Sequence, residues 1–81
     1  MKTVKYNSES NAQFLDWAIH ELWLKNDLQL ARKLKMTSAH MSWIRSGKSP
    51  VGAIMIARLH SLLPNVSIKE LVERSKYAQH T

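Results

Sequence analysis

Apolar residues recur along most of the chain at the three- and four-residue spacing of amphipathic helices, and no period-two stretch is long enough for a strand. Breaks in this pattern divide the chain into five predicted helices, over residues 11–25, 27–34, 38–46, 49–63 and 67–79. The sequence therefore predicts an all-α fold, a compact five-helix domain over residues 11–75. We expect residues 1–10 to be a flexible N-terminal segment and residues 76–81 to be a C-terminal tail.

Capping residues mark the predicted helix ends. Ser, Thr, Asn and Asp side chains accept hydrogen bonds from the free N–H groups of a first turn, and a following Glu or Gln can complete a capping box. Gly47 follows the third helix, where a left-handed residue commonly ends a helix, and Pro64 forbids continuation of the fourth. The predicted N-terminal caps are Ser10 with Gln13, Asn26 or Asp27, Thr37, Ser49 before Pro50, and Ser67 with Glu70.

Helical periodicity also predicts which side chains form the core. On the third helix, Met41 and Ile44 point inward, which leaves Trp43 nearer the exposed side. Trp17 and Trp23 on the first helix are expected in the core or at its edge. The other predicted core residues are Phe14, Leu15, Ala18, Ile19, Leu22, Leu30, Ala31, Leu34, Val51, Ile54, Met55, Leu59, Leu62, Ile68, Leu71 and Val72.

Positive charge is concentrated in the middle of the chain. The protein has a formal net charge of +6, of which residues 1–27 contribute −1 and residues 69–81 contribute +1. Residues 28–68 hold six Lys or Arg and no acid. Such a block suits a polyanion, because each cation placed against a phosphate releases condensed counterions. A solvated basic face without a partner explains the composition equally well, since net charge constrains function loosely.

Several function classes lack the residues they need. The chain has no Cys, which excludes disulfides, thiolate zinc sites and thiol nucleophiles. Its four His recur every twenty residues, a spacing without helical meaning, so we expect no metal site. Residues 46–49 imitate only the end of a P-loop, and no paired acids or Ser–His arrangement indicates catalysis. We therefore expect no enzyme, no cofactor and no small-molecule substrate.

The second and third predicted helices are short and separated by a tight break at residues 35–36. This is a helix-turn-helix arrangement, in which the second helix is held out to enter a major groove. The stretch LQLARKLKMTSAHMSWIRSGKSP resembles the phage repressor and Cro-type (lambda-repressor-like) helix-turn-helix family, over about residues 11–72. The resemblance implies a five-helix DNA-binding domain and a sequence-specific transcriptional regulator, Cro-like or repressor-like, that reads duplex DNA with helix 38–46.

Carried over position by position, the resemblance implies two sets of DNA-contacting residues. Ser38 and Ala39 fall where the family's helix first meets base edges, and Trp43 falls one turn later. Ser and His can exchange hydrogen bonds with base edges, and Ala or Trp can pack on a thymine methyl. The base-facing set is Ser38, Ala39, His40, Ser42 and Trp43, and the phosphate-facing set is Arg32, Lys33, Lys35, Thr37, Ser46 and Lys48.

Several positions depart from the family pattern. Asp27 stands where the family often has a DNA-contacting Gln, and an acid next to phosphate is unfavourable there unless it caps the second helix instead. Lys35 occupies a turn position that is often Gly, so it has to adopt a costlier backbone conformation or reshape the turn. Arg45 replaces an acid that pairs with a first-helix Arg in the family, and Glu21 can complete a reversed pair. No Arg, Gln or Asn falls within residues 38–43, so specificity is expected to be modest or to depend on DNA shape.

Two function classes remain open. The first is a DNA-binding regulator that is a homodimer at least on DNA, with dimer contacts from the last helix and residues 76–81. The second is a protein-interaction module on the same fold (an antitoxin, anti-repressor or adaptor), in which Trp43 docks on another protein. No apolar run approaches the ~18 residues of a membrane span, and residues 1–10 lack the apolar region of a secretory signal. We therefore expect a cytoplasmic protein, in a bacterial or phage-infected cell, with no membrane partner.

Overall fold

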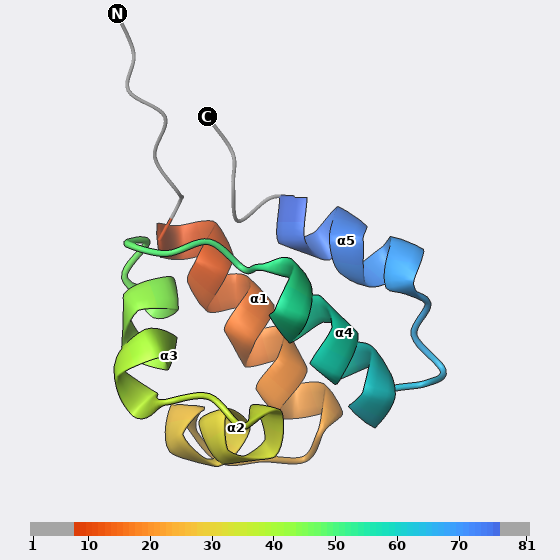
Figure 1. The fold of residues 1–81 in the computed structure, drawn as a ribbon, viewed down its shortest axis with the longest axis horizontal. Helices are drawn as coiled ribbons and strands as arrows, with labels where there is room; N and C mark the ends of the chain where they lie inside the picture. The colour runs from red at the N-terminus through yellow and green to blue at the C-terminus, as the bar shows by residue number, and fades with distance from the viewer. Residues whose placement is uncertain (1–7, 77–81) are drawn as a thin grey trace, which may run out of the picture.

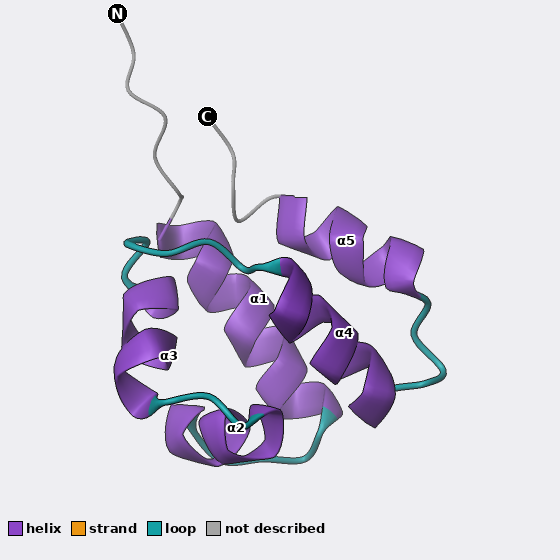
Figure 2. Cartoon of the chain, in the orientation of Figure 1, coloured by secondary structure: helices purple, strands orange, loops and turns teal. Residues whose placement is uncertain are grey.

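Helices make up most of residues 8–76, the part of the chain that the computed structural model describes (Figure 1). They are α1 (Ser8–Glu21), α2 (Asp27–Leu34), α3 (Ser38–Arg45), α4 (Ala53–Leu62) and α5 (Ile68–Lys76). Only loops connect them, and this range contains no strand (Figure 2). The predicted all-α class with five helices is therefore confirmed.

The two predicted terminal segments lie largely outside the described residues. Residues 8–10, expected in the flexible N-terminal segment, already belong to α1. Residues 1–7 and 77–81, which include the predicted end of the last helix near Gln79, are outside the described range.

α1 lies at the centre of the domain and contacts α2, α3 and α5. α4 packs against α2 and α5, so the contacts form a ring from α3 through α2, α4 and α5 back to α1. In Figure 1, α3 and α2 occupy the left and lower edges of the molecule, away from α5. The core between the helices consists of Phe14, Leu15, Ala18, Leu30, Ala31, Leu34, Met41, Ile44, Val51, Met55, Ile56, Leu59 and Leu71.

Some predicted core residues of α4 and α5 are exposed instead. α4 turns Met55, Ile56 and Leu59 inward, and Ile54 lies nearly opposite their mean direction at ~100° per residue, so it is 68% exposed. α5 buries only a narrow stripe, Leu71 with Ser75. The predictions that Ile54, Leu62, Ile68 and Val72 are core residues are therefore wrong.

The end of α1 is set by a residue in the left-handed conformation. Trp23 has φ 59°, and its N–H donates to the His20 carbonyl (3.1 Å) while the Leu24 N–H donates to the Ile19 carbonyl (2.9 Å). These bonds form a Schellman motif, which satisfies carbonyl groups at the helix end. The predicted continuation to Lys25 is wrong. Trp23, expected in the core or at its edge, is 94% exposed because the helix ends before reaching it.

Two predicted helix starts are also wrong. α1 already includes Ser8, so Ser10 lies inside the helix and is not its N-cap. α4 begins at Ala53 with Gly52 as its N-cap, later than the predicted start at Ser49–Pro50. The reason is that the backbone of Ser49 is held by other elements: its N–H donates to the Trp43 carbonyl (3.2 Å), and its carbonyl accepts from Asn11 (3.0 Å).

The other predicted starts are confirmed by hydrogen bonds from side-chain oxygens to first-turn N–H groups. Gly47 follows α3 with φ 85°, as predicted for a left-handed residue. The cap bonds join Asn26 Oδ1 to the Gln29 N–H (2.9 Å), Thr37 Oγ1 to the His40 N–H (3.0 Å) and Ser67 Oγ to the Glu70 N–H (3.1 Å).

Candidate functional site

The turn between α2 and α3 holds these two short helices in a fixed arrangement. Lys35 has φ 55°, which confirms the costlier backbone conformation expected at this position. Its N–H donates to the Arg32 carbonyl (3.2 Å), and the Met36 N–H donates to the Ala31 carbonyl (2.8 Å), a second Schellman motif. From α4, Arg58 Nη1 donates to the carbonyls of Leu34 (2.9 Å) and Lys35 (3.1 Å). The turn is thus closed by its own backbone and clamped by an arginine.

α3 has one buried face and one exposed face. Met41 and Ile44 are each 1% exposed and pack in the core, as predicted. Trp43 is 51% exposed, which confirms its predicted exposure. The predicted base-facing residues Ser38, Ala39, His40, Ser42 and Trp43 are all exposed, so the structure brings them together on the outer face of one helix.

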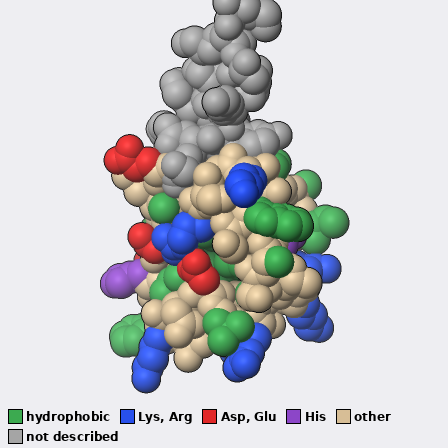
Figure 3. Space-filling view, turned by 90° about the vertical axis from the view of Figure 1, so that its left-hand side faces the viewer, with side chains coloured by type: hydrophobic (Ala, Val, Ile, Leu, Met, Phe, Trp, Pro, Cys, Tyr) green, Lys and Arg blue, Asp and Glu red, His purple; other side chains and the backbone are tan. Residues whose placement is uncertain are grey.

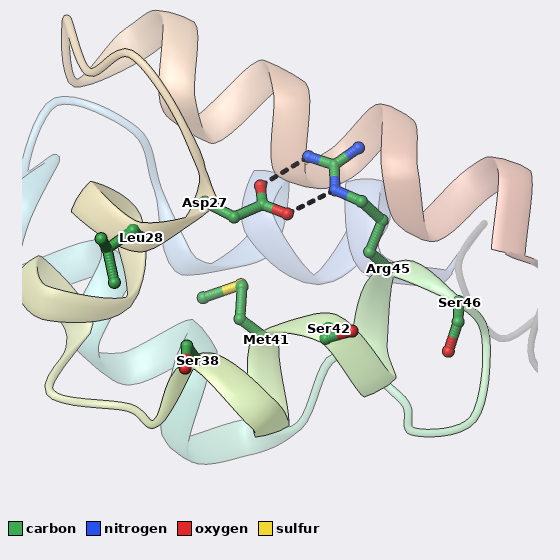
Figure 4. A pocket seen from close by; sticks show the side chains of 7 residues that line it. All are labelled: Asp27, Leu28, Ser38, Met41, Ser42, Arg45 and Ser46. Atoms are coloured by element: carbon green, nitrogen blue, oxygen red, sulfur yellow. Dashed lines mark hydrogen bonds and ion pairs between the residues drawn. The ribbon is translucent and has the colours of Figure 1, made fainter.

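Hollows border α3 on both sides. One lies between α2 and α3, and the side chains of Leu28, Ser42 and Arg45 are among its lining (Figure 4). The other lies between α3, the turn before it and the start of α4, where His40, Met36 and Ile54 are among the lining residues. α3 is therefore a ridge between two depressions of the surface.

Arg45, at the end of α3, holds three helices together through two acids. Its Nε and Nη2 donate to Oδ2 (2.6 Å) and Oδ1 (2.7 Å) of Asp27 at the start of α2 (Figure 4). Nη2 also donates to Asp16 Oδ1 (2.8 Å) on α1. Such bidentate Arg–carboxylate bonds are directional, so they fix how α3 sits against α1 and α2. We call Asp16, Asp27 and Arg45 the ion cluster.

The ion cluster bears on two predictions. Glu21 is not the partner of Arg45; its Oε2 lies 3.8 Å from Nδ1 of His20. Of the two residues predicted as alternative caps of α2, Asn26 is the cap and Asp27 is not, which leaves both Asp27 oxygens to Arg45. The hydrogen bonds that Arg45 donates to Asp27, and secondarily to Asp16, raise the pKa of its guanidinium above the ordinary value. The stabilisation that comes from the charge of the guanidinium is fully present below its ordinary pKa and is lost in strongly alkaline solution, as the pH rises through the folded-state value.

Cationic and hydroxyl side chains lie at both ends of α3. The side chains at the start of α3 come from the last turn of α2 and from residues 35–37. The side chains at its end come from the loop that follows Arg45. Figure 3 looks onto this side of the molecule, where Lys and Arg lie along the lower edge and near the top, with paired acidic and basic groups between them. The predicted phosphate-facing residues Arg32, Lys33, Lys35, Thr37, Ser46 and Lys48 are all exposed.

Sequence reasoning missed two residues that position this surface. Asn11 is completely buried, and its Nδ2 donates to the carbonyls of Ile44 (2.6 Å) and Ser49 (3.0 Å), which ties α1 to the end of α3. Arg58 belongs to the basic block of residues 28–68, and the sequence assigns it no separate role. Asn11 has one local signal, a polar residue among the apolar positions of α1, whereas the role of Arg58 depends on how α4 packs against α2.

Among residues 8–76, no group of three or more His, Asp or Glu is placed to hold a metal ion. None of the helices in that range is long and apolar enough to cross a membrane. Comparison of the chain with protein-family models, with curated proteins and with solved structures finds no match. The features of the molecule that bear on its function are therefore the geometry of the α2–α3 surface and the resemblance of its residues to the helix-turn-helix family.

Proposed function

We propose that this protein is a sequence-specific duplex DNA-binding regulator, in which α2 and α3 are a lambda-repressor-like helix-turn-helix and α3 enters the major groove. One observation carries the proposal. α3 is a ridge whose outer face presents only small, hydroxyl and aromatic side chains, with cations at both of its ends. A helix ~10–12 Å across fits a major groove ~12 Å wide, which is how the second helix of this motif binds.

The flanking cations supply the sequence-independent part of binding. Lys33 and Lys35 lie near the start of α3 and Lys48 lies beyond its end, so the three can contact phosphates on either side of a groove that α3 occupies. Each phosphate contact releases counterions and makes binding salt-dependent. Asp27 does not oppose this, because its charge is offset by Arg45.

Dimerisation on DNA would supply the affinity that one short helix lacks. Ile68 and Val72 lie one turn apart on α5 and are 50% and 36% exposed, so this apolar stripe is the proposed contact between two copies. The two α3 helices would then read half-sites about one helical turn, ~34 Å, apart. A complex with one protein per preferred site, measured by sedimentation, would contradict the dimer.

The test is selection from random duplex DNA, followed by affinity measurements across a salt series. The logarithm of the binding constant should fall with the logarithm of salt, with a slope of about −0.9 per phosphate contact. Lys48→Ala should weaken specific and non-specific binding similarly and make the slope shallower by about one unit. Lys48→Arg is the matched control, since it keeps the positive charge at the same position and should leave the slope unchanged. Absence of binding at low salt would disprove the proposal.

A protein-interaction module on the same fold is the second candidate, and the half-exposed indole of Trp43 favours it because exposed tryptophans are frequent interface anchors. The Trp43→Ala variant distinguishes the DNA-binding regulator from the protein-interaction module. The variant should stay folded, with a stability change of at most ~1 kcal/mol. Loss of specific DNA binding, with salt-sensitive non-specific binding retained, supports the regulator. Normal DNA binding with loss of a protein partner supports the module.

A further inference from the structure

We infer that α3 selects A·T base pairs by packing Ala39 and Trp43 on the C5-methyl groups of thymine, so that the preferred half-site is thymine-rich. The inference rests on the proposed DNA-binding function and adds the class of sequence that α3 recognises.

The side chains that usually read the other bases are absent from the outer face of α3 or already engaged. Guanine is read mainly by Arg or Lys, adenine by Asn or Gln, and cytosine by Asp or Glu. Residues 38–43 include none of these types. Arg45 is held by Asp16 and Asp27, and Asp27 uses both of its oxygens for this pair. The amide oxygen of Gln29, on α2, accepts a local backbone hydrogen bond.

Besides the hydrogen bonds that Ser38, His40 and Ser42 can exchange with base edges, α3 offers apolar contact with a thymine methyl, for which it has the right residues in register. Ala39 and Trp43 are both exposed and four residues apart, so they lie on one stripe of the helix, ~6 Å apart along its axis. Successive bases of one strand are ~3.4 Å apart. When α3 lies along the groove, the two side chains therefore meet methyl groups about two base steps apart.

The Trp43 indole has a neighbouring ring, and the backbone that carries it is fixed by hydrogen bonds. The His40 ring lies beside it, with ring centroids 6.5 Å apart. The Trp43 carbonyl accepts from Ser46 Oγ (3.1 Å) and from the Lys48 N–H (2.8 Å), which fixes the backbone at the end of α3. An indole so placed and half exposed offers a positioned apolar surface, whereas the Ser38 and Ser42 hydroxyls can pair with any base.

Replacing thymine by deoxyuridine tests this directly, because the exchange removes only the C5-methyl group and preserves base pairing. The wild-type protein is measured on its selected site and on duplexes in which each thymine in turn is deoxyuridine. Each contacted methyl should contribute about fourfold in affinity, the equivalent of ~0.8 kcal/mol. In the Trp43→Ala variant, the loss of affinity on replacing thymine by deoxyuridine should disappear at the one thymine that Trp43 contacts. In Trp43→Phe, which keeps an aromatic ring, this loss should persist. Lys48→Ala should bind more weakly yet keep the full deoxyuridine effect.

A second arm restores the methyl group on another base. At a contacted thymine, 5-methylcytosine paired with guanine should bind better than unmodified cytosine, since it carries the methyl at the same place. A site that binds specifically but tolerates deoxyuridine at every position, or a selected site rich in G·C pairs, overturns this inference and leaves the proposed function intact. Absence of binding to any duplex at low salt overturns the proposed function itself.

Discussion

Replacing Arg45 by Met should lower the free energy of unfolding by about 2 kcal/mol, because the ion cluster joins three helices. Arg45 and Asp27 side chains are each 33% exposed and share two short hydrogen bonds, so this bidentate pair is assigned ~1.5 kcal/mol. Asp16 is 67% exposed, and solvent screening reduces its bond to ~0.5 kcal/mol. For a domain of this size, 2 kcal/mol corresponds to a fall in Tm of about 10 °C.

Urea unfolding followed by far-UV circular dichroism measures the effect, and Met is chosen because it keeps most of the apolar stem of Arg45. Lys48→Ala is the charge-matched control, since among residues 8–76 its side chain forms no ion pair, and it should leave the unfolding midpoint unchanged. A double-mutant cycle of Arg45→Met with Asp27→Asn should give a coupling free energy of about 1 kcal/mol or more. An Arg45→Met variant as stable as the Lys48→Ala control would refute the view that the ion cluster fixes α3.

Three further predictions concern stability and use the same unfolding assay. Trp23→Gly should raise the free energy of unfolding by about 0.5–1 kcal/mol, because it relieves a left-handed residue whose side chain is 94% exposed; a less stable variant would contradict this. Asn11→Asp should lower the free energy of unfolding by ~3 kcal/mol or more, because it places a completely buried carboxylate against the carbonyls of Ile44 and Ser49. An unchanged free energy of unfolding would show that water reaches the site. Leu59→Ala, at a fully buried position of α4, should cost about 2–5 kcal/mol, and a loss below ~1 kcal/mol would mean that the core closes around it.

The helix boundaries that could be predicted are those with a local chemical cause. Asn26, Thr37 and Ser67 each accept a hydrogen bond from an N–H group three residues later, so the starts of α2, α3 and α5 depend on a few adjacent residues. The same applies to Gly47, whose positive φ ends α3 without steric cost. The buried faces of α2 and α3 were predictable for a related reason, since helical spacing alone determines them.

The remaining errors arise where the local residue types give no signal or where tertiary contacts outweigh local preference. A left-handed Trp23 ends α1 although tryptophan has no preference for that conformation. The Ser49–Pro50 pair favours a helix start, but the bond from Asn11 on α1 holds Ser49 in the preceding loop. The partners of Arg45 could not be read from helical spacing, because Asp16 and Asp27 meet it only when α1, α2 and α3 are packed.

The division of α3 into a buried pair, Met41 and Ile44, and an outward set has an evolutionary consequence. The residues that face outward can be exchanged without rebuilding the core, so descendants of this protein can change the chemistry of this surface while inheriting the same scaffold. The core can likewise drift among apolar residues of similar volume without altering the outer face. Arg45 limits this freedom, because its place on α3 is tied to acids on two other helices, and a change there calls for matching changes at Asp16 and Asp27. Packing therefore leaves Ser38, Ala39, His40, Ser42 and Trp43 unconstrained among relatives, whereas it couples the residues of the ion cluster.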